Sequence, residues 1–303
     1  MQKDKRIKAA FITFIALAIK FCFPLFLAYF ANEKDFSFLL ISYNTLLMTG
    51  FVFSLEHHTY YHRVAIQKKK LAKIDLFEKK YFDQTLFIKL LIALVVLFLL
   101  DQLLLIQKLI VFFIIFLDLH IVENMRKAIV KGDFFKSSLI NGARLSFPII
   151  IFMIVFLIKK DIFLNYILLT TLLSFIVIKF IFNIRICNLK NLRIKKDLFL
   201  KLTFKTGQYS LISIISILMP LLDKFILLNF EEYKMIQTMT LWAIFGNLIA
   251  LFIHEYINKP YQPLIMNYLK KQSFKKIYRN IISYLSLLLI LCSLSIILFI
   301  FQF

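Results

Sequence analysis

The succession of long apolar segments constrains this chain more than any other feature. Nine segments cover residues 9–31, 36–55, 86–106, 109–130, 139–158, 162–183, 206–229, 233–256 and 281–302. Each is close to the ~20 residues that cross the hydrocarbon core of a bilayer as a helix. Backbone polar groups in lipid must bond within their own segment, which a helix allows. The sequence therefore predicts an all-α integral membrane protein with about nine transmembrane helices.

The composition supports a membrane class and argues against a nucleic-acid partner. Of 303 residues, 61% are hydrophobic, and the mean hydropathy is +0.81. Lys and Arg together number 38 against 17 Asp and Glu, a net charge of +21. In a soluble protein that surplus would suggest nucleic acid. Here it lies in short clusters between apolar segments, as in the loops that flank membrane helices.

These clusters fall on alternate connections, which predicts an orientation. Lys and Arg are concentrated in residues 1–8, 63–80, 126–136, 185–205 and 270–279. The other connections are short and include Glu33, Asp35, Glu231 and Glu232. The positive-inside rule then places the N-terminus in the cytoplasm and, after nine spans, the C-terminus outside.

The basic stretch 185–205 predicts a division into two lobes. We expect a six-helix N-terminal lobe over residues 1–184, a cytoplasmic linker over 185–205, and a shortened three-helix lobe over 206–303. Lys20-Phe21 and Lys224-Phe225 each precede an apolar stretch and a short acidic turn. This similarity indicates a parallel pseudo-repeat, a common plan among transporters.

Charged and titratable residues inside the predicted spans are the candidate functional groups, because each costs several kcal/mol in lipid unless it meets a partner or water. At 1.5 Å per residue, Lys20 lies about 20 Å into its span. The candidate residues are Lys20, Asp118, His120, Glu123, Arg144, Asp223 and Lys224.

Two interpretations of these residues stay open. They could pair with one another and hold the bundle together, for instance Lys20 with Asp118. Alternatively, Lys20, Arg144, Asp223 and Lys224 could line a cationic, water-filled cavity, with Asp118, His120 or Glu123 coupling transport to an ion.

Three further cations are expected to be structural only. Lys89, Arg126 and Lys179 lie within about two turns of the cytoplasmic face, where long side chains can reach water.

A metal site or a cofactor is not expected. The pair His58 and His62 has the four-residue spacing of a helical metal site, but no second pair accompanies it. We expect these histidines to contact lipid headgroups at the interface. Cys22, Cys187 and Cys292 lie far apart and are interpreted as free thiols.

Several segments resemble one membrane-protein family. TGQYSLISIISILMPLLDKFILLNF (206–230) resembles the seventh helix of the polysaccharide flippases, the O-antigen translocases, where an Asp-Arg/Lys-Phe triplet follows an apolar run. FSLEHHTYYHR (53–63), GAR (142–144) and HEYINKPYQPLI (254–265) are similar to the ends of its second and eighth helices and the start of its fifth. This family belongs to the multidrug/oligosaccharidyl-lipid/polysaccharide exporter superfamily.

The resemblance implies a transporter of the bacterial inner membrane that performs no chemical step. Family members move an oligosaccharide, linked by diphosphate to a polyprenyl lipid, from the inner to the outer leaflet by alternating access. Lys and Arg in a cavity would replace the hydration of the diphosphate, since bare charge in hydrocarbon is very costly. Relative to the family, the second lobe is expected to be short. A homodimer, or another polysaccharide-assembly membrane protein, is expected to complete it.

Three alternatives remain at this point. A membrane-embedded acyltransferase or polymerase acting on lipid-linked sugars would need a deep His or carboxylate pair. A multidrug or cation antiporter of the same superfamily would be expected to place more carboxylates in its cavity. An inactive, truncated family member is the third.

Overall fold

The computed structural model describes residues 2–58, 60, 79–99, 103–131, 133–159, 164–186 and 196–252, and its secondary-structure elements there are all helices. The Cα positions cluster into two compact units, Met1–Gln237 and Thr238–Phe303. The first unit contains every residue of the candidate site. In the second unit, the described residues belong to a single helix.

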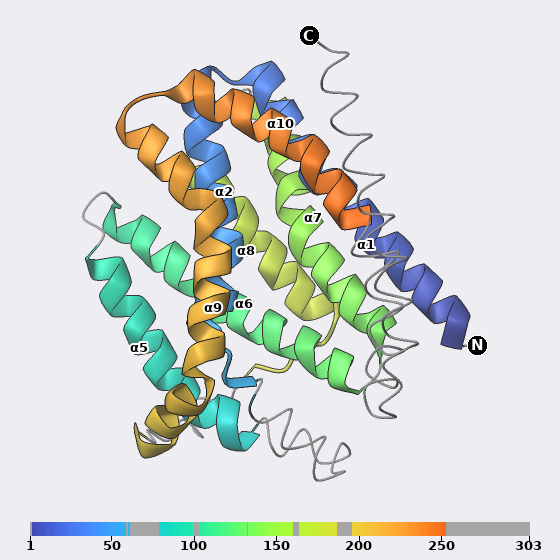
Figure 1. The fold of residues 1–303 in the computed structure, drawn as a ribbon, viewed down its shortest axis with the longest axis vertical. Helices are drawn as coiled ribbons and strands as arrows, with labels where there is room; N and C mark the ends of the chain where they lie inside the picture. Colours follow the sequence, from blue (N-terminus) through green and yellow to red (C-terminus); the bar gives the residue numbers. More distant parts are fainter. Residues whose placement is uncertain are drawn as a thin grey trace, which may run out of the picture. The chain divides into compact units, whose positions relative to one another are not determined.

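Figure 1 shows the described helices, coloured in order along the chain. They are α1 (Gln2–Phe30), α2 (Glu33–Ser54), the π-helical turn η2 (Lys79–Asp83), α5 (Gln84–Phe98), α6 (Leu105–Val130), α7 (Phe134–Lys159), α8 (Leu164–Ile181), α9 (Lys196–Asn229) and α10 (Tyr233–Phe252). The last of these continues into the second unit.

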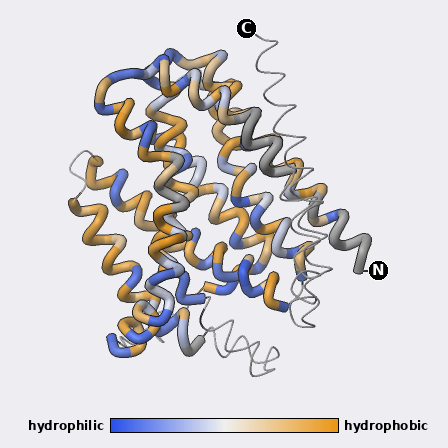
Figure 2. The backbone as a smooth tube through the Cα atoms, in the orientation of Figure 1, coloured by the Kyte–Doolittle hydropathy of each residue, from blue (hydrophilic) through white to orange (hydrophobic). Residues whose placement is uncertain are grey.

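Six described helices are long and apolar enough to cross a bilayer, so the chain is a multi-pass membrane protein. These spans are Phe11–Phe30, Glu33–Ser54, Tyr81–Phe98, Leu105–Val130, Phe134–Ile158 and Leu164–Ile181. Figure 2 shows apolar residues along most of their length and hydrophilic residues near many of their ends. The expected seventh span falls within α9, and α10 covers the first part of the eighth. Residues 253–256 of the eighth span and all of the ninth lie outside the described residues.

Two boundaries differ from the sequence prediction. The third span was expected over 86–106, but α5 ends at Phe98 and α6 begins at Leu105. Leucines flank this connection on both sides, so hydropathy alone does not mark where one helix ends and the next begins. The second half of the expected linker is helical, since α9 begins at Lys196. Lys and Leu are good helix formers, so the helix extends beyond its apolar part.

Helix α6 is the central element of the first unit. It packs against α2, α5, α7 and α8, while α1 packs on α7 and α9 packs on α2 and α5 (Figure 1). Ile114, Leu119 and Ile121 of α6 are at most 1% exposed. Polar residues on this helix are therefore deep inside the bundle.

Local sequence signals explain several helix ends. The Asn32 side chain accepts a hydrogen bond from the Asp35 backbone N–H at 2.8 Å, a standard N-cap of α2. Asn183 ends α8 in the left-handed region (φ 50°), and the Ile184 N–H donates to the Lys179 carbonyl at 3.0 Å. Asn tolerates this conformation better than most residues.

Helices α1 and α7 each contain a proline one turn after a cation. Pro24 follows Lys20 by four residues, and Pro148 follows Arg144 by four. Proline lacks the N–H that would bond to the carbonyl one turn earlier, so carbonyls near it lose their helical partners. The carbonyls that lose their partners in this way are those of Lys20 and Arg144. The Tyr43 hydroxyl of α2 donates to the adjacent carbonyl, that of Leu145, at 2.8 Å.

Candidate functional site

The deepest charged contact joins α7 to α6. The Arg144 Nε lies 2.5 Å from Asp118 Oδ1, and its Nη2 lies 2.8 Å from Oδ2. The two residues are 1% and 0% exposed. Two parallel charge-assisted hydrogen bonds make this the strongest geometry an arginine and a carboxylate can adopt. We call it the inner ion pair. It corrects the alternative that paired Asp118 with Lys20.

Helix α2 holds both members of the inner ion pair through its backbone. The Gly50 N–H donates to Asp118 Oδ2 at 2.8 Å, and Arg144 Nη2 donates to the Leu47 carbonyl. A Cβ at position 50 would lie 2.2 Å from Asp118 Oδ2. Position 50 must therefore be glycine for this arrangement to form.

Two further cations approach this region from α1 and α9. Lys20 is half-buried midway along its span and makes no hydrogen bond or ion pair with any described residue. Two other cations, Arg144 and Lys224, are close enough to act electrostatically on Lys20. Asp223 is exposed, accepts the Lys224 backbone N–H at 2.8 Å, and also acts on the Lys224 charge.

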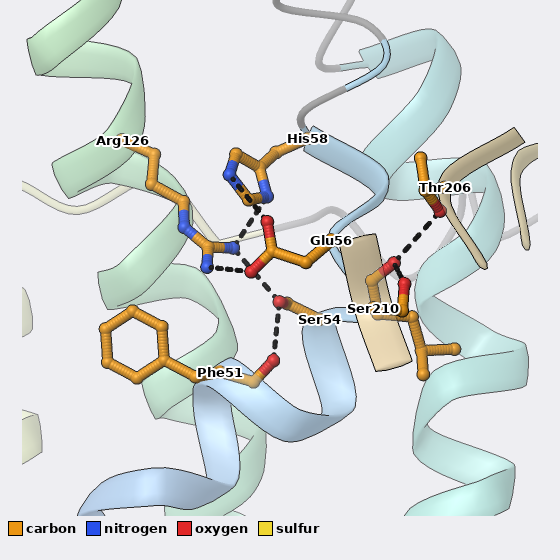
Figure 3. Close-up of polar contacts among 8 residues, drawn as sticks. Phe51, Ser54, Glu56, His58, Arg126, Thr206 and Ser210 are labelled. Atoms are coloured by element: carbon orange, nitrogen blue, oxygen red, sulfur yellow. Dashed lines mark hydrogen bonds and ion pairs between the residues drawn. The ribbon is translucent and has the colours of Figure 1, made fainter. Parts of the chain in front are cut away.

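A second polar network surrounds Arg126 where α2 ends (Figure 3). Arg126 Nη1 donates to Ser54 Oγ at 3.0 Å and to His58 Nδ1 at 2.8 Å, and its Nη2 donates to Glu56 Oε1 at 3.2 Å. Because Nδ1 accepts, the proton of a neutral His58 is on Nε2, which lies 3.3 Å from Glu56 Oε2. We call Ser54, Glu56, His58 and Arg126 the α2-end network.

Phe51 connects the two charged groups. The Arg144 guanidinium carbon lies 4.8 Å from the ring centroid, and that of Arg126 lies 5.1 Å from it. Both separations are in the range of cation–π attraction. One aromatic side chain of α2 thus contacts both buried guanidinium groups.

The backbone break after α2 makes the main polar contact to α9. Leu55 and Glu56 are both left-handed, with φ of 51° and 49°. This region is unfavourable for non-glycine residues. The Leu55 carbonyl turns toward α9 and accepts the hydroxyls of Thr206 at 3.2 Å and Ser210 at 2.6 Å, two side chains shown in Figure 3.

His57 fills the space between this break and α9. It is 1% exposed, with Nε2 3.1 Å from Thr203 Oγ1 and the ring edge-on to Phe199. Burial, with a smaller effect from the charge of Lys89, lowers the pKa of His57 from 6.5 to about 2. His57 is therefore neutral at physiological pH.

The structure corrects the expectation that Lys89 and Arg126 reach water. Lys89 is 2% exposed and Arg126 8% exposed. The Lys89 ammonium lies 5.4 Å from the Phe82 ring centroid, with the charges of Arg126 and Glu56 nearby. The depth estimate used position along one helix, whereas burial depends on the neighbouring helices, such as α2, whose end contacts Arg126. Lys179 is half-buried.

The proposed coupling residues of α6 are all buried. His120 Nδ1 lies 2.8 Å from the Phe116 carbonyl and therefore carries a proton, and its ring packs on Phe82. Glu123 is 3% exposed, with the charge of Arg126 nearby. Among the described residues, no group of three or more His, Cys, Asp or Glu is arranged to hold a metal ion. His62 lies outside the described residues.

The sequence pointed to Lys20, Arg144, Asp118 and Lys224 but missed the α2 residues that contact Asp118 and Arg144. Gly50 could have been found, because an isolated glycine in an apolar helix often marks a close approach. Leu47, Phe51 and Ser54 give no such local signal, because their contacts depend on which helices lie beside α2.

Comparison with known proteins identifies no relative. No protein-family model matches the chain. A search of curated proteins finds no match. A search of solved structures finds none either.

Proposed function

We propose that this chain is a transporter of the bacterial inner membrane that moves a polyprenyl-diphosphate-linked oligosaccharide by alternating access. The observation that carries the proposal is Lys20, a mid-span cation without a partner among the described residues and within range of Arg144 and Lys224. A lone charge at this depth costs roughly 2.5–3.5 kcal/mol on insertion scales. An anionic ligand would offset that cost.

The charge balance favours an anionic substrate over a cationic one. Lys20, Arg144 and Lys224 bring three positive charges, and Asp118 and Asp223 bring two negative ones, which leaves one positive charge. Asp118 is moreover already bound to Arg144. A negatively charged diphosphate would neutralise this positive surplus, whereas a cation antiporter would need a net negative charge at its site.

The experiment is transport in proteoliposomes with a fluorescent short-chain polyprenyl-diphosphate glycan, read by quenching from outside. Lys20→Glu should abolish transbilayer movement while the protein still inserts. Lys34→Glu is the matched control, because Lys34 is exposed in the first turn of α2. Full transport by a stably inserted Lys20→Glu protein would exclude the proposal. Movement of a neutral glycolipid at the same rate would exclude the diphosphate as the recognised group.

A further inference from the structure

The Arg144 guanidinium group uses only some of its N–H donors in hydrogen bonds to the described residues. Its Nε and Nη2 atoms donate to Asp118, and Nη2 also donates to the Leu47 carbonyl. Its third nitrogen, Nη1, makes no hydrogen bond within the described part of the chain. A guanidinium has five N–H donors in a fork that matches carboxylate and phosphate oxygens equally well. The Asp118 carboxylate thus occupies a position that a phosphate could take.

The donors around Asp118 are those of an anion-binding site. Its Oδ1 accepts from Arg144 Nε, and its Oδ2 accepts from Arg144 Nη2 and from the Gly50 backbone N–H. Arginine forks and free backbone N–H groups are the usual ligands of phosphate in proteins. The space at Gly50 that a Cβ would fill lets the Asp118 carboxylate approach the backbone.

We propose that Asp118 is an internal substitute for the substrate anion, and that the substrate's diphosphate displaces it from Arg144. This inference rests on the proposed function. The exchange is favoured by charge, because a diphosphate brings more than the single negative charge of a carboxylate. Lys20, whose charge interacts with those of Arg144 and Lys224, adds attraction for the diphosphate that Asp118 alone does not use.

The exchange has a structural consequence for α2. Asp118 is the acceptor for Gly50, so its displacement breaks this hydrogen bond between α2 and α6, while Arg144 of α7 still donates to the Leu47 carbonyl. The Leu55 carbonyl still holds α2 to Thr206 and Ser210 of α9. Ligand binding therefore changes which helices α2 is attached to. Differential contacts of this kind are what a ligand needs to shift a conformational equilibrium.

The test measures binding of radiolabelled farnesyl diphosphate to the purified full-length protein, with farnesol as the uncharged comparison. Asp118→Asn removes the competing charge and leaves Arg144 uncompensated. We expect it to bind farnesyl diphosphate at least about tenfold more tightly than the unmodified protein. Arg144→Gln should bind it at least about tenfold more weakly. Glu33→Gln, an exposed carboxylate change at the start of α2, should leave binding unchanged.

Hydrogen–deuterium exchange of the α2 peptide containing Gly50 supplies the second readout. Farnesyl diphosphate should speed amide exchange there in the unmodified protein, and Asp118→Asn should show the faster exchange without ligand. If Asp118→Asn does not fold, Gly50→Ala replaces it, because the added Cβ displaces the carboxylate while its charge remains. Ligand that slows exchange of this peptide would overturn the proposal.

The outcomes separate the two proposals. If the unmodified protein binds farnesyl diphosphate no better than farnesol and transports no diphosphate lipid, the proposed function fails. If it binds and transports the diphosphate lipid but Asp118→Asn binds no tighter, Asp118 is a structural partner of Arg144 and only this inference fails.

Discussion

Replacing Gly50 with alanine is the sharpest single test of the inner ion pair. The new Cβ would lie 2.2 Å from Asp118 Oδ2 and 2.6 Å from its Cγ, and 3.2 Å from the backbone carbonyl carbon of the same residue. Ordinary contact begins near 3.4 Å, so the carboxylate must retreat by about 1.2 Å. Its hydrogen bond to the residue 50 N–H, now 2.8 Å, would then exceed the limit for such a bond.

The expected cost follows from what the shift breaks. Disrupting a buried ion pair costs about 3–5 kcal/mol when a charge is left uncompensated. Alanine recovers about 1 kcal/mol through its better helix propensity. The net loss in the free energy of unfolding should be about 2–4 kcal/mol. Helicity followed by circular dichroism during titration with SDS measures it.

Two other glycines in helices serve as controls. Gly207→Ala adds a Cβ with nothing within 4 Å, and Gly142→Ala adds one 3.2 Å from an Ile12 methyl group. We expect Gly207→Ala to be neutral or slightly stabilising and Gly142→Ala to fall between the two. If the Gly50→Ala protein is as stable as the Gly207→Ala protein, the contact between α2 and the inner ion pair does not contribute to the free energy of unfolding.

Three further outcomes are expected. The pKa of His57 is about 2 in the folded protein and 6.5 in the unfolded protein, so the unfolded state binds the proton first as pH falls. The free energy of unfolding should therefore fall by up to about 1.4 kcal/mol per pH unit below pH 6.5. In SDS titrations, His57→Gln should reduce this dependence on pH. Combining Thr206→Val with Ser210→Ala leaves the Leu55 carbonyl without its hydroxyl donors and should lower the free energy of unfolding by about 1–3 kcal/mol. If the SDS concentration at the unfolding midpoint does not change, these two hydrogen bonds do not stabilise the packing of α9 on α2. A reporter active only outside should report after Lys34 and stay silent after Lys131; the reverse pattern would invert the predicted topology.

The sequence was sufficient to predict the six spans of the first unit, apart from the end of the third, and to single out the charges within them. Apolar length fixes a span, and residue count fixes depth along a helix, so Lys20, Asp118 and Arg144 could be singled out. Their partners could not be assigned, because pairing depends on which helices are neighbours. Asp118 meets Arg144 since α6 and α7 pack together, a fact that hydropathy does not contain.

The same limitation explains the error for Lys89 and Arg126. Depth along α5 and α6 placed both within reach of water, but burial is decided by the helices packed around them. The turn at Leu55 and Glu56 was also unpredictable, because neither residue is a usual choice for a left-handed conformation. Only Gly50 carried a local signal for the close approach found there.

The spacing of the inner ion pair along the chain also affects how the protein enters the membrane. Asp118 and Arg144 are 26 residues apart, on α6 and α7, which are separated only by residues 131–133. During synthesis the carboxylate of α6 leaves the ribosome first, and alone at mid-helix it disfavours partition into lipid by about 2.5–3.5 kcal/mol. Its counter-charge follows about one helix later. Helices α6 and α7 are therefore suited to leave the translocation channel together as a hairpin, with the carboxylate and guanidinium already neutralising each other when they reach the hydrocarbon.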